Sequence, residues 1–358
     1  MASSPRINPN RTTGNDALDD RITELLAAVD PGATDTDRRL DHRDQLREIL
    51  VSAVLMAVDT GDQKADRLDL KIANAALQEM RRGYLMLGPH RGKRKVTIFG
   101  SARTAEHDPL YELTRQTAEE FAARGWMVIT GAGPGIMAAG LEGAGREKAL
   151  GVSIRLPFES QANEFVDDEN LVDMRYFFTR KLALMRESDG FVVMPGGFGT
   201  LDETFELLTL VQTGKATPVP IVMLGLGHGF WTAWQQFVEK VMEQGYISGG
   251  DKSLYCITNS VEEAVSTVLG FYGNYHSIRW VGDRLVVRMQ RGPSAAQLTA
   301  ISEEFRSSTT DEKGVSITSP LRAEEDEQDN LALPRISLML NRRAPGKLRA
   351  LIDRVNEW

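Results

Sequence analysis

Three glycine-rich loops, each directly after a short apolar run, are the parts of this sequence best suited to bind an anion. They are residues 99–103 (FGSAR), 130–137 (TGAGPGIM) and 194–200 (MPGGFGT). Glycine lets a backbone approach a ligand closely, and free N–H groups at a helix N-terminus attract phosphate. One such loop alone is weak evidence, because tight strand-to-helix turns also need glycine. The three together favour an anionic ligand, with Ser101, Gly133 and Gly196 as candidate contacts.

Charged side chains accompany these loops. Glu203 follows the third loop, and Thr200 and Glu203 have the T-x-x-E spacing of a helix capping box. Glu203 therefore has two interpretations, a helix cap or a carboxylate at the mouth of a phosphate-binding loop. Glu159 follows another short apolar run, and Arg180-Lys181 precede the strand that leads into the third loop. Taken alone, a basic pair of this kind is usually a solvated surface feature.

Several other chemistries find no support in the sequence. Residues 131–135 lack the third glycine of a dinucleotide-binding G-x-G-x-x-G, and Gly214-Lys215 lacks the rest of a Walker A loop. The five histidines are scattered, without metal-ligand spacing, so we expect no metal. No G-x-S-x-G elbow or Ser/His/Asp set is recognisable.

The elements that must position these loops form an alternating pattern. Short apolar runs predict five strands, near residues 96–100, 126–130, 151–157, 190–194 and 219–224. Helical patterns lie between or after them, near residues 110–125, 136–149, 177–187, 201–212 and 231–244. Continuous apolar strands separated by helices indicate a parallel sheet covered on both faces. The predicted fold class is α/β, a doubly wound Rossmann-like parallel sheet. Ligands bind such sheets outside the carboxyl ends of the strands.

Two extensions flank this predicted sheet domain of residues 91–270. Residues 1–90 have helical periodicity over 44–58 and 64–87, which predicts a packing or oligomerisation element and, most simply, a homodimer. Residues 271–358 predict a small α+β extension with a hairpin around Gly282-Asp283, a helix over 293–305, a strand over 336–340 and a closing helix over 346–356. The acidic run of residues 323–330 is expected to be a solvated loop.

Composition narrows the class of protein. The 358 residues are 42% hydrophobic and 26% charged, enough apolar material for a core. The formal net charge of −8 argues against a nucleic-acid-binding protein. A single cysteine, Cys256, excludes an internal disulfide and fits a cytoplasmic protein. The polar N-terminus predicts no signal peptide, and the longest apolar stretch, residues 49–58, is too short for a membrane span.

The combined motifs resemble those of the LONELY GUY (LOG) family of nucleoside 5′-monophosphate phosphoribohydrolases, longer bacterial type. Residues 195–203 (PGGFGTLDE) match its P-G-G-x-G-T-x-x-E signature, and Arg180-Lys181 match its Arg-Lys pair. Residues 130–137 resemble its T-G-G-G-P-G-I-M loop, with Ala132 in place of a glycine, and 156–159 resemble its L-P-x-E segment. The resemblance covers roughly residues 94–250.

This resemblance implies hydrolysis of the N-glycosidic bond of a nucleoside 5′-monophosphate, of AMP or cytokinin type, to free base and ribose 5-phosphate. It implies Arg180 and Glu203 as the catalytic pair and no cofactor. The nucleotide contacts that it implies are Glu159, Lys181, Gly197, Phe198, Gly199, Thr200, Leu201, Asp202 and Thr209. The family has also been labelled lysine decarboxylase, but nothing in the sequence supports a pyridoxal phosphate site.

The residues are consistent with this chemistry. Breaking an N-glycosidic bond builds positive charge on the ribose, which the Glu203 carboxylate can stabilise while it orients or deprotonates water. Arg180 can stabilise the leaving base or fix Glu203. The alternative is a non-catalytic nucleotide-binding or sensing protein of the same fold. Such a binder would not need both Glu203 and Arg180, so the presence of both favours the enzyme.

Overall fold

The computed structural model describes residues 12–29, 37–58, 65–155, 163–227, 229–326, 328, 330–341 and 345–358. The chain divides into two compact units. One consists of residues 1–77 with 320–331, and the other of residues 78–319 with 332–358.

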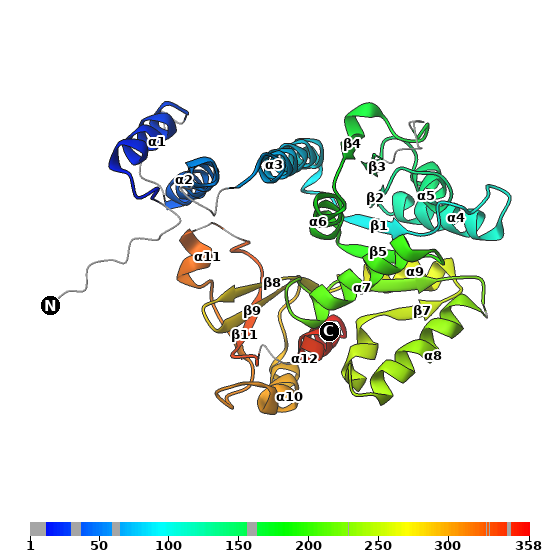
Figure 1. The fold of residues 1–358 in the computed structure, drawn as a ribbon. Coiled ribbons are helices and arrows are strands. Elements are labelled where there is room, and N and C mark those ends of the chain that lie inside the picture. The colour runs from blue at the N-terminus through cyan, green and yellow to red at the C-terminus, as the bar shows by residue number, and fades with distance from the viewer. Residues whose placement is uncertain are drawn as a thin grey trace. The chain divides into compact units, whose positions relative to one another are not determined.

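A seven-stranded parallel sheet forms the centre of the second unit (Figure 1). Its strands, in spatial order, are β4 (Leu171–Met174), β3 (Ala149–Ile154), β2 (Met127–Thr130), β1 (Lys95–Phe99), β5 (Gly190–Val193), β6 (Ile221–Leu224) and β7 (Cys256–Thr258). The chain adds strands outward from β1 to β4 and then returns to add β5 to β7 on the other side of β1. The predicted doubly wound topology is confirmed. The strand order reverses between β1 and β5, where such sheets bind ligands.

The two edge strands, β4 and β7, are not among the strands that the sequence predicts. Strand β7 has three residues, and β4 contains the exposed Asp173. An edge strand pairs on one side only and is less enclosed than the central strands, so its sequence need not form a continuous apolar run.

Helices cover both faces of this sheet. The helices α4 (Pro109–Ala123), α5 (Ile136–Ala144) and α9 (Val261–Gly270) pack on one face, and α6 (Phe177–Glu187), α7 (Phe198–Gln212) and α8 (Phe230–Glu243) on the other. Within β1, Ile98 joins the apolar cluster on the α4 side, and Phe99 joins the cluster on the α7 side. Strands buried on both faces must be apolar throughout, which explains the continuous runs in the sequence. In the described part of the chain, no helix is both long and apolar enough to cross a membrane.

The helix predicted over residues 136–149 is wrong at its C-terminal end. Helix α5 ends at Ala144, because Gly145 has a positive φ of 71°, which glycine adopts readily and a helix does not continue, and β3 begins at Ala149. Helix α5 also lies very close to α4. A Cβ atom on Gly143 would stand 2.0 Å from the backbone oxygen of Arg115 in α4.

The rest of the second unit is built on a four-stranded antiparallel sheet in the order β10 (Ser316–Ile317), β11 (Arg335–Leu338), β9 (Arg284–Met289) and β8 (Tyr275–Val281). Helices α10 (Ala295–Phe305) and α12 (Pro345–Asn356) pack with it around an apolar cluster that includes Leu285, Val287 and Met289 of β9. The predicted hairpin is confirmed, with Gly282 at a φ of 59° in its turn. Short 3₁₀ helices are η2 (Gly88–His90), η3 (Asp168–Asn170), η4 (Gly249–Leu254) and η5 (Arg306–Ser308).

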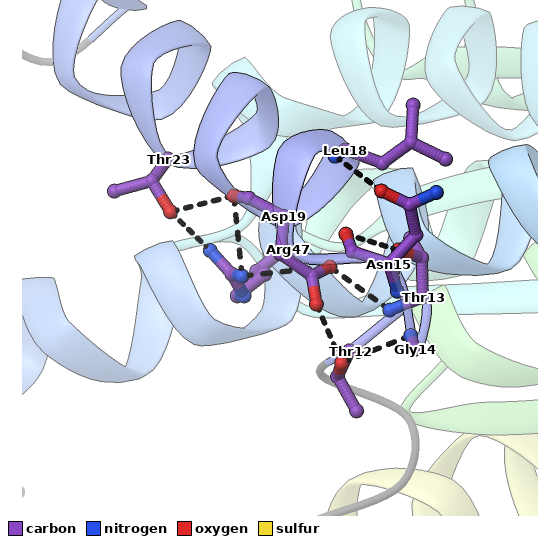
Figure 2. Close-up of polar contacts among 8 residues, drawn as sticks. All are labelled: Thr12, Thr13, Gly14, Asn15, Leu18, Asp19, Thr23 and Arg47. Carbon is purple, nitrogen blue, oxygen red and sulfur yellow. Dashed lines mark hydrogen bonds and ion pairs between the residues drawn. The ribbon is translucent and has the colours of Figure 1, made fainter.

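The first unit contains α1 (Asp16–Val29), α2 (Asp37–Val58), the start of α3 (Arg67–Leu87) and α11 (Arg322–Asp326). The predicted helical character of this zone is confirmed. Figure 2 shows the polar contacts that join α1 to α2. Asp19 accepts hydrogen bonds from the Thr12 hydroxyl (2.5 Å) and the Thr13 N–H (2.9 Å), and Arg47 donates to the Thr23 hydroxyl (2.8 Å). Ile22, Leu26 and Val51 form the small apolar core between the two helices.

The expectation of a solvated loop over the acidic run is wrong for part of that run. Residues Arg322–Asp326 form α11, and the side chain of Glu324 is buried. Its carboxylate accepts a hydrogen bond from the backbone N–H of Leu321 (3.0 Å), just before the helix begins. A carboxylate in this position satisfies one of the free N–H groups at a helix N-terminus.

The close approach of α4 and α5 gives a test of the fold. Gly143→Ala should destabilise the protein by about 1–3 kcal/mol, because the new methyl group meets rigid backbone of α4. Gly270→Ala, also within a helix, is the matched control, since nothing lies within 4 Å of a Cβ at that position. Urea unfolding of both variants measures the difference, and equal stability would show that α5 does not pack on α4 in this way.

Candidate active site

The three glycine-rich loops meet at the carboxyl edge of the parallel sheet. The N–H of Ser101, after β1, donates to the carbonyl of Pro195, after β5 (3.3 Å). The carbonyl of Ser101 accepts a hydrogen bond from the N–H of Ile136, at the start of α5 (3.0 Å). These backbone contacts tie together loops that are far apart in the sequence. The shared edge lies where the strand order reverses, which is where a ligand is expected.

The glycines of these loops differ in what surrounds them. A Cβ on Gly196 would stand 2.2 Å from the Thr200 hydroxyl, so this glycine is required by packing. Gly197 and Gly199 have open space at the same position, and the Phe198 side chain is 93% exposed. Packing within the chain therefore does not explain these two glycines. A ligand that approaches the loop closely would explain them.

The capping-box interpretation of Glu203 is wrong. Helix α7 begins at Phe198, with Gly197 as its N-cap, so Thr200 and Glu203 both lie inside the helix. Among the described residues, no side chain makes a capping hydrogen bond at this N-terminus. The first N–H groups of α7 are consequently available at the shared edge of the loops, as a phosphate site requires.

Arg180 and Glu203 face each other next to the glycine loops. The Arg180 Nη1 atom lies 3.6 Å from Glu203 Oε1, and each residue is 8% exposed. Arg180 Nε donates to the carbonyl of Val152 in β3 (3.0 Å). A Cβ on Gly131 would stand 1.9 Å from Arg180 Nη2, so only glycine leaves room for the guanidinium. The sequence singles out neither Val152, which acts through its backbone carbonyl, nor this role of Gly131, which acts through the absence of a side chain.

The surroundings of Glu203 change its acidity. Burial raises the pKa of Glu203 to about 7, against the opposing effect of Arg180 and Lys181. A carboxyl group with a pKa near neutrality exchanges protons readily at physiological pH. Such strongly shifted groups are concentrated at functional sites.

Lys181 links the two helices that carry the pair. Its Nζ atom lies 2.7 Å from Asp202 Oδ2 and 2.7 Å from Glu206 Oε2, both in α7. Burial acts to lower the pKa of Lys181, but the hydrogen bonds to Asp202 and Glu206 outweigh it and the pKa is raised. Lys181 is therefore charged, and it fixes α6 against α7.

The remaining predicted contacts lie in different places. Ser101 and Gly133 belong to the meeting loops, and the Gly133 carbonyl accepts from Asn163 Nδ2 (3.2 Å). Leu201 packs partly against the apolar core. Thr209 is exposed and stands about 16 Å along α7 from the start of the helix, so this chain does not bring it to the loop. Glu159 lies outside the described residues.

No cluster of three or more His, Cys, Asp or Glu side chains that could hold a metal ion occurs among the residues that the structure describes.

The shifted pKa of Glu203 makes stability depend on pH. The folded state holds the proton more tightly than the unfolded state, so this group lowers stability as pH rises from about 4.5 to about 7. Glu203→Gln should therefore stabilise the protein relative to wild type at pH 8, by at most about 3 kcal/mol, and much less at pH 5. Thermal unfolding at both pH values measures this. Glu303→Gln, at an exposed site, is the control, and a pH-independent effect of Glu203→Gln would contradict the assignment.

Comparisons with known proteins find similar sequences over part of the chain. A family model described as "Possible lysine decarboxylase" matches residues 134–268. A cytokinin riboside 5′-monophosphate phosphoribohydrolase of Arabidopsis thaliana is 24% identical over 161 residues, covering 43% of this chain and 73% of the relative. One of Mycobacterium tuberculosis is 27% identical over 168 residues, covering 46% of this chain and 88% of the relative.

Among solved structures, the molybdenum cofactor carrier protein of Chlamydomonas reinhardtii is 22% identical and covers 49% of this chain and 96% of its own, with a TM-score of 0.37. Over less than half of its length, the chain is therefore similar in sequence to cytokinin riboside 5′-monophosphate phosphoribohydrolases.

Proposed function

We propose that this protein hydrolyses the N-glycosidic bond of a nucleoside 5′-monophosphate, of AMP or cytokinin riboside type, to release the free base and ribose 5-phosphate. The observation that carries the proposal is the buried pair of Arg180 and Glu203 beside an open helix N-terminus. The relatives named as phosphoribohydrolases support the same reaction. The catalytic domain is proposed to span residues 91–270, with extensions at 1–90 and 271–358.

Glu203 is the proposed catalytic carboxylate. Cleavage builds positive charge on the ribose, and an ionised carboxylate next to C1′ stabilises that charge and directs water to it. A pKa of about 7 lets Glu203 take a proton from this water near neutral pH. Arg180, held by the Val152 carbonyl, keeps part of the Glu203 population ionised despite its burial.

The phosphate is proposed to bind at the N-terminus of α7. The backbone N–H groups of residues 197–200 and the positive end of the helix dipole suit a dianion. The phosphate is remote from the bond that breaks, and its binding energy positions the sugar over Glu203. The other proposed contacts are Ser101, Gly133, Gly196, Lys181, Asp202 and, on the family resemblance, Glu159 and Leu201; Thr209 is left out because it lies far along α7 from the loop.

A homo-oligomer in the cytoplasm is proposed as the working form. Apolar side chains of the N-terminal helices, among them Leu25, Leu46 and Leu68, are exposed in the single chain. Burying them against a second copy would remove this surface from water. The single cysteine fits a reducing compartment.

The role of Glu203 is tested by Glu203→Gln, which keeps the size of the side chain and removes its charge. Release of free base from AMP should fall about a hundredfold or more, the scale typical of acid–base and electrostatic groups. Glu243→Gln, on the exposed side of α8, is the matched control and should keep normal turnover. Near-normal turnover of the Glu203 variant would reject the catalytic role.

The role of the loops is tested by comparing AMP with adenosine. Each charge-assisted hydrogen bond to the phosphate contributes about 1.5–3 kcal/mol, so losing two or three should lower kcat/KM by several orders of magnitude. Free adenine released from AMP, adenosine and ATP under one condition measures this preference. Equal rates with AMP and adenosine would show that the loops do not bind the phosphate. A protein that binds AMP but releases no base would instead be a nucleotide-binding protein.

A further inference from the structure

A buried carboxylate outside the predicted sheet domain contacts the helix that carries Arg180. Glu79 lies in α3, and its side chain is 2% exposed. Its Oε2 atom accepts hydrogen bonds from the Thr179 hydroxyl (2.6 Å) and from the Tyr176 N–H (3.2 Å). These two donors belong to the N-cap residue and the first turn of α6.

The first turn of α6 has no cap of its own. The side chain of Tyr176, its N-cap residue, makes no capping hydrogen bond. Glu79 takes the place of that cap from another helix, and its negative charge suits the positive end of the α6 dipole. Burying a carboxylate is costly unless its hydrogen bonds are satisfied, so this contact holds the turn in one position.

The contact between α3 and α6 extends beyond Glu79. Met80, Gly83 and Leu87 face Met174 and Ala183 across a residual cavity of about 10 Å³, which is too small for a ligand. A Cβ on Gly83 would stand 3.2 Å from the Met174 side chain. The guanidinium of Arg186, near the other end of α6, lies 4.9 Å from the centre of the Tyr84 ring. This packing of α3 on α6 holds the Glu79 carboxylate next to the first turn of α6.

Arg180 immediately follows Thr179, and its N–H donates to the Tyr176 carbonyl (3.3 Å). A shift of this turn therefore moves the Arg180 guanidinium relative to Glu203. We propose that Glu79 is a positioning residue, which fixes the first turn of α6 and so directs Arg180 at Glu203. The inference rests on the proposed function for its meaning in catalysis, but the contacts themselves do not depend on it.

The charged groups around Glu203 determine the direction in which its pKa should shift when Arg180 moves. Arg180 and Lys181 in α6 lower its pKa, and Asp202 and Glu206 in α7 raise it. If Arg180 moves away, the pKa of Glu203 rises above about 7. The acidic limb of the pH–rate profile then moves to higher pH, because fewer molecules carry the ionised carboxylate.

The experiment titrates Glu203 directly, by infrared difference spectra between each protein and the same protein with Glu203→Gln. Glu79→Ala should raise the midpoint of the Glu203 titration by about one pH unit or more. The acidic limb of the pH–rate profile should move by the same amount. Thr179→Val, which leaves α3 intact, should raise the midpoint of the Glu203 titration by less than Glu79→Ala does. Glu79→Gln keeps an acceptor oxygen for both hydrogen bonds and should return the midpoint to the wild-type value or slightly below it. If Glu79 acted only through its negative charge, removing that charge would lower the midpoint of the Glu203 titration. The direction of the shift therefore distinguishes a positioning role of Glu79 from a purely electrostatic one.

Tyr84→Ala is the control for packing, because it weakens the far end of the same helix pair. It should lower the melting temperature without moving the midpoint. An unchanged midpoint in folded Glu79→Ala and Thr179→Val would overturn the proposal, and if Glu79→Ala does not fold, Thr179→Val decides alone. Absence of hydrolysis in every protein would reject the proposed function, while a shifted midpoint would still support the positioning role.

Discussion

The buried contact between Arg180 and Glu203 constrains the elements around it. Two opposite charges inside a protein are stable only if each has further polar partners and fixed geometry. Arg180 meets this condition through the Val152 carbonyl, and Gly131 leaves the space that its guanidinium occupies. Strand β3, the loop after β2, and helices α6 and α7 must therefore keep their relative positions for the pair to exist.

The same contact connects fold and chemistry. The reversal of strand order between β1 and β5 brings the loops after these strands together, and α7 starts directly from one of them. Glu203 lies in the second turn of that helix, close to the open N-terminus but shielded from water. A helix N-terminus suited to phosphate and a carboxyl group with a pKa near 7 thus come from one element.

The central sheet was predictable because buried parallel strands are apolar throughout and glycine marks their ends. The helix starts were less so. Glycine at 197 is a weaker signal for an N-cap than Thr200, yet the backbone there begins the helix three residues earlier, which removes the capping role of Glu203. The end of α5 is hard to predict because Gly145 follows a continuous helical pattern.

The candidate site was predictable only as far as motifs reach. Residues 195–203 and Arg180 could be named, but the acidity of Glu203 depends on burial that no spacing reveals. Glu79 lies 100 residues before Thr179, and only the packing of α3 on α6 distinguishes it from other glutamates on helices.

A crystal structure of Glu203→Gln with bound AMP decides whether the Arg180–Glu203 pair is the reaction centre. We expect the phosphate on the backbone N–H groups of residues 197–200, and C1′ of the ribose next to residue 203 and Arg180. A phosphate bound elsewhere, or a ribose turned away from residue 203, would contradict the proposed mechanism.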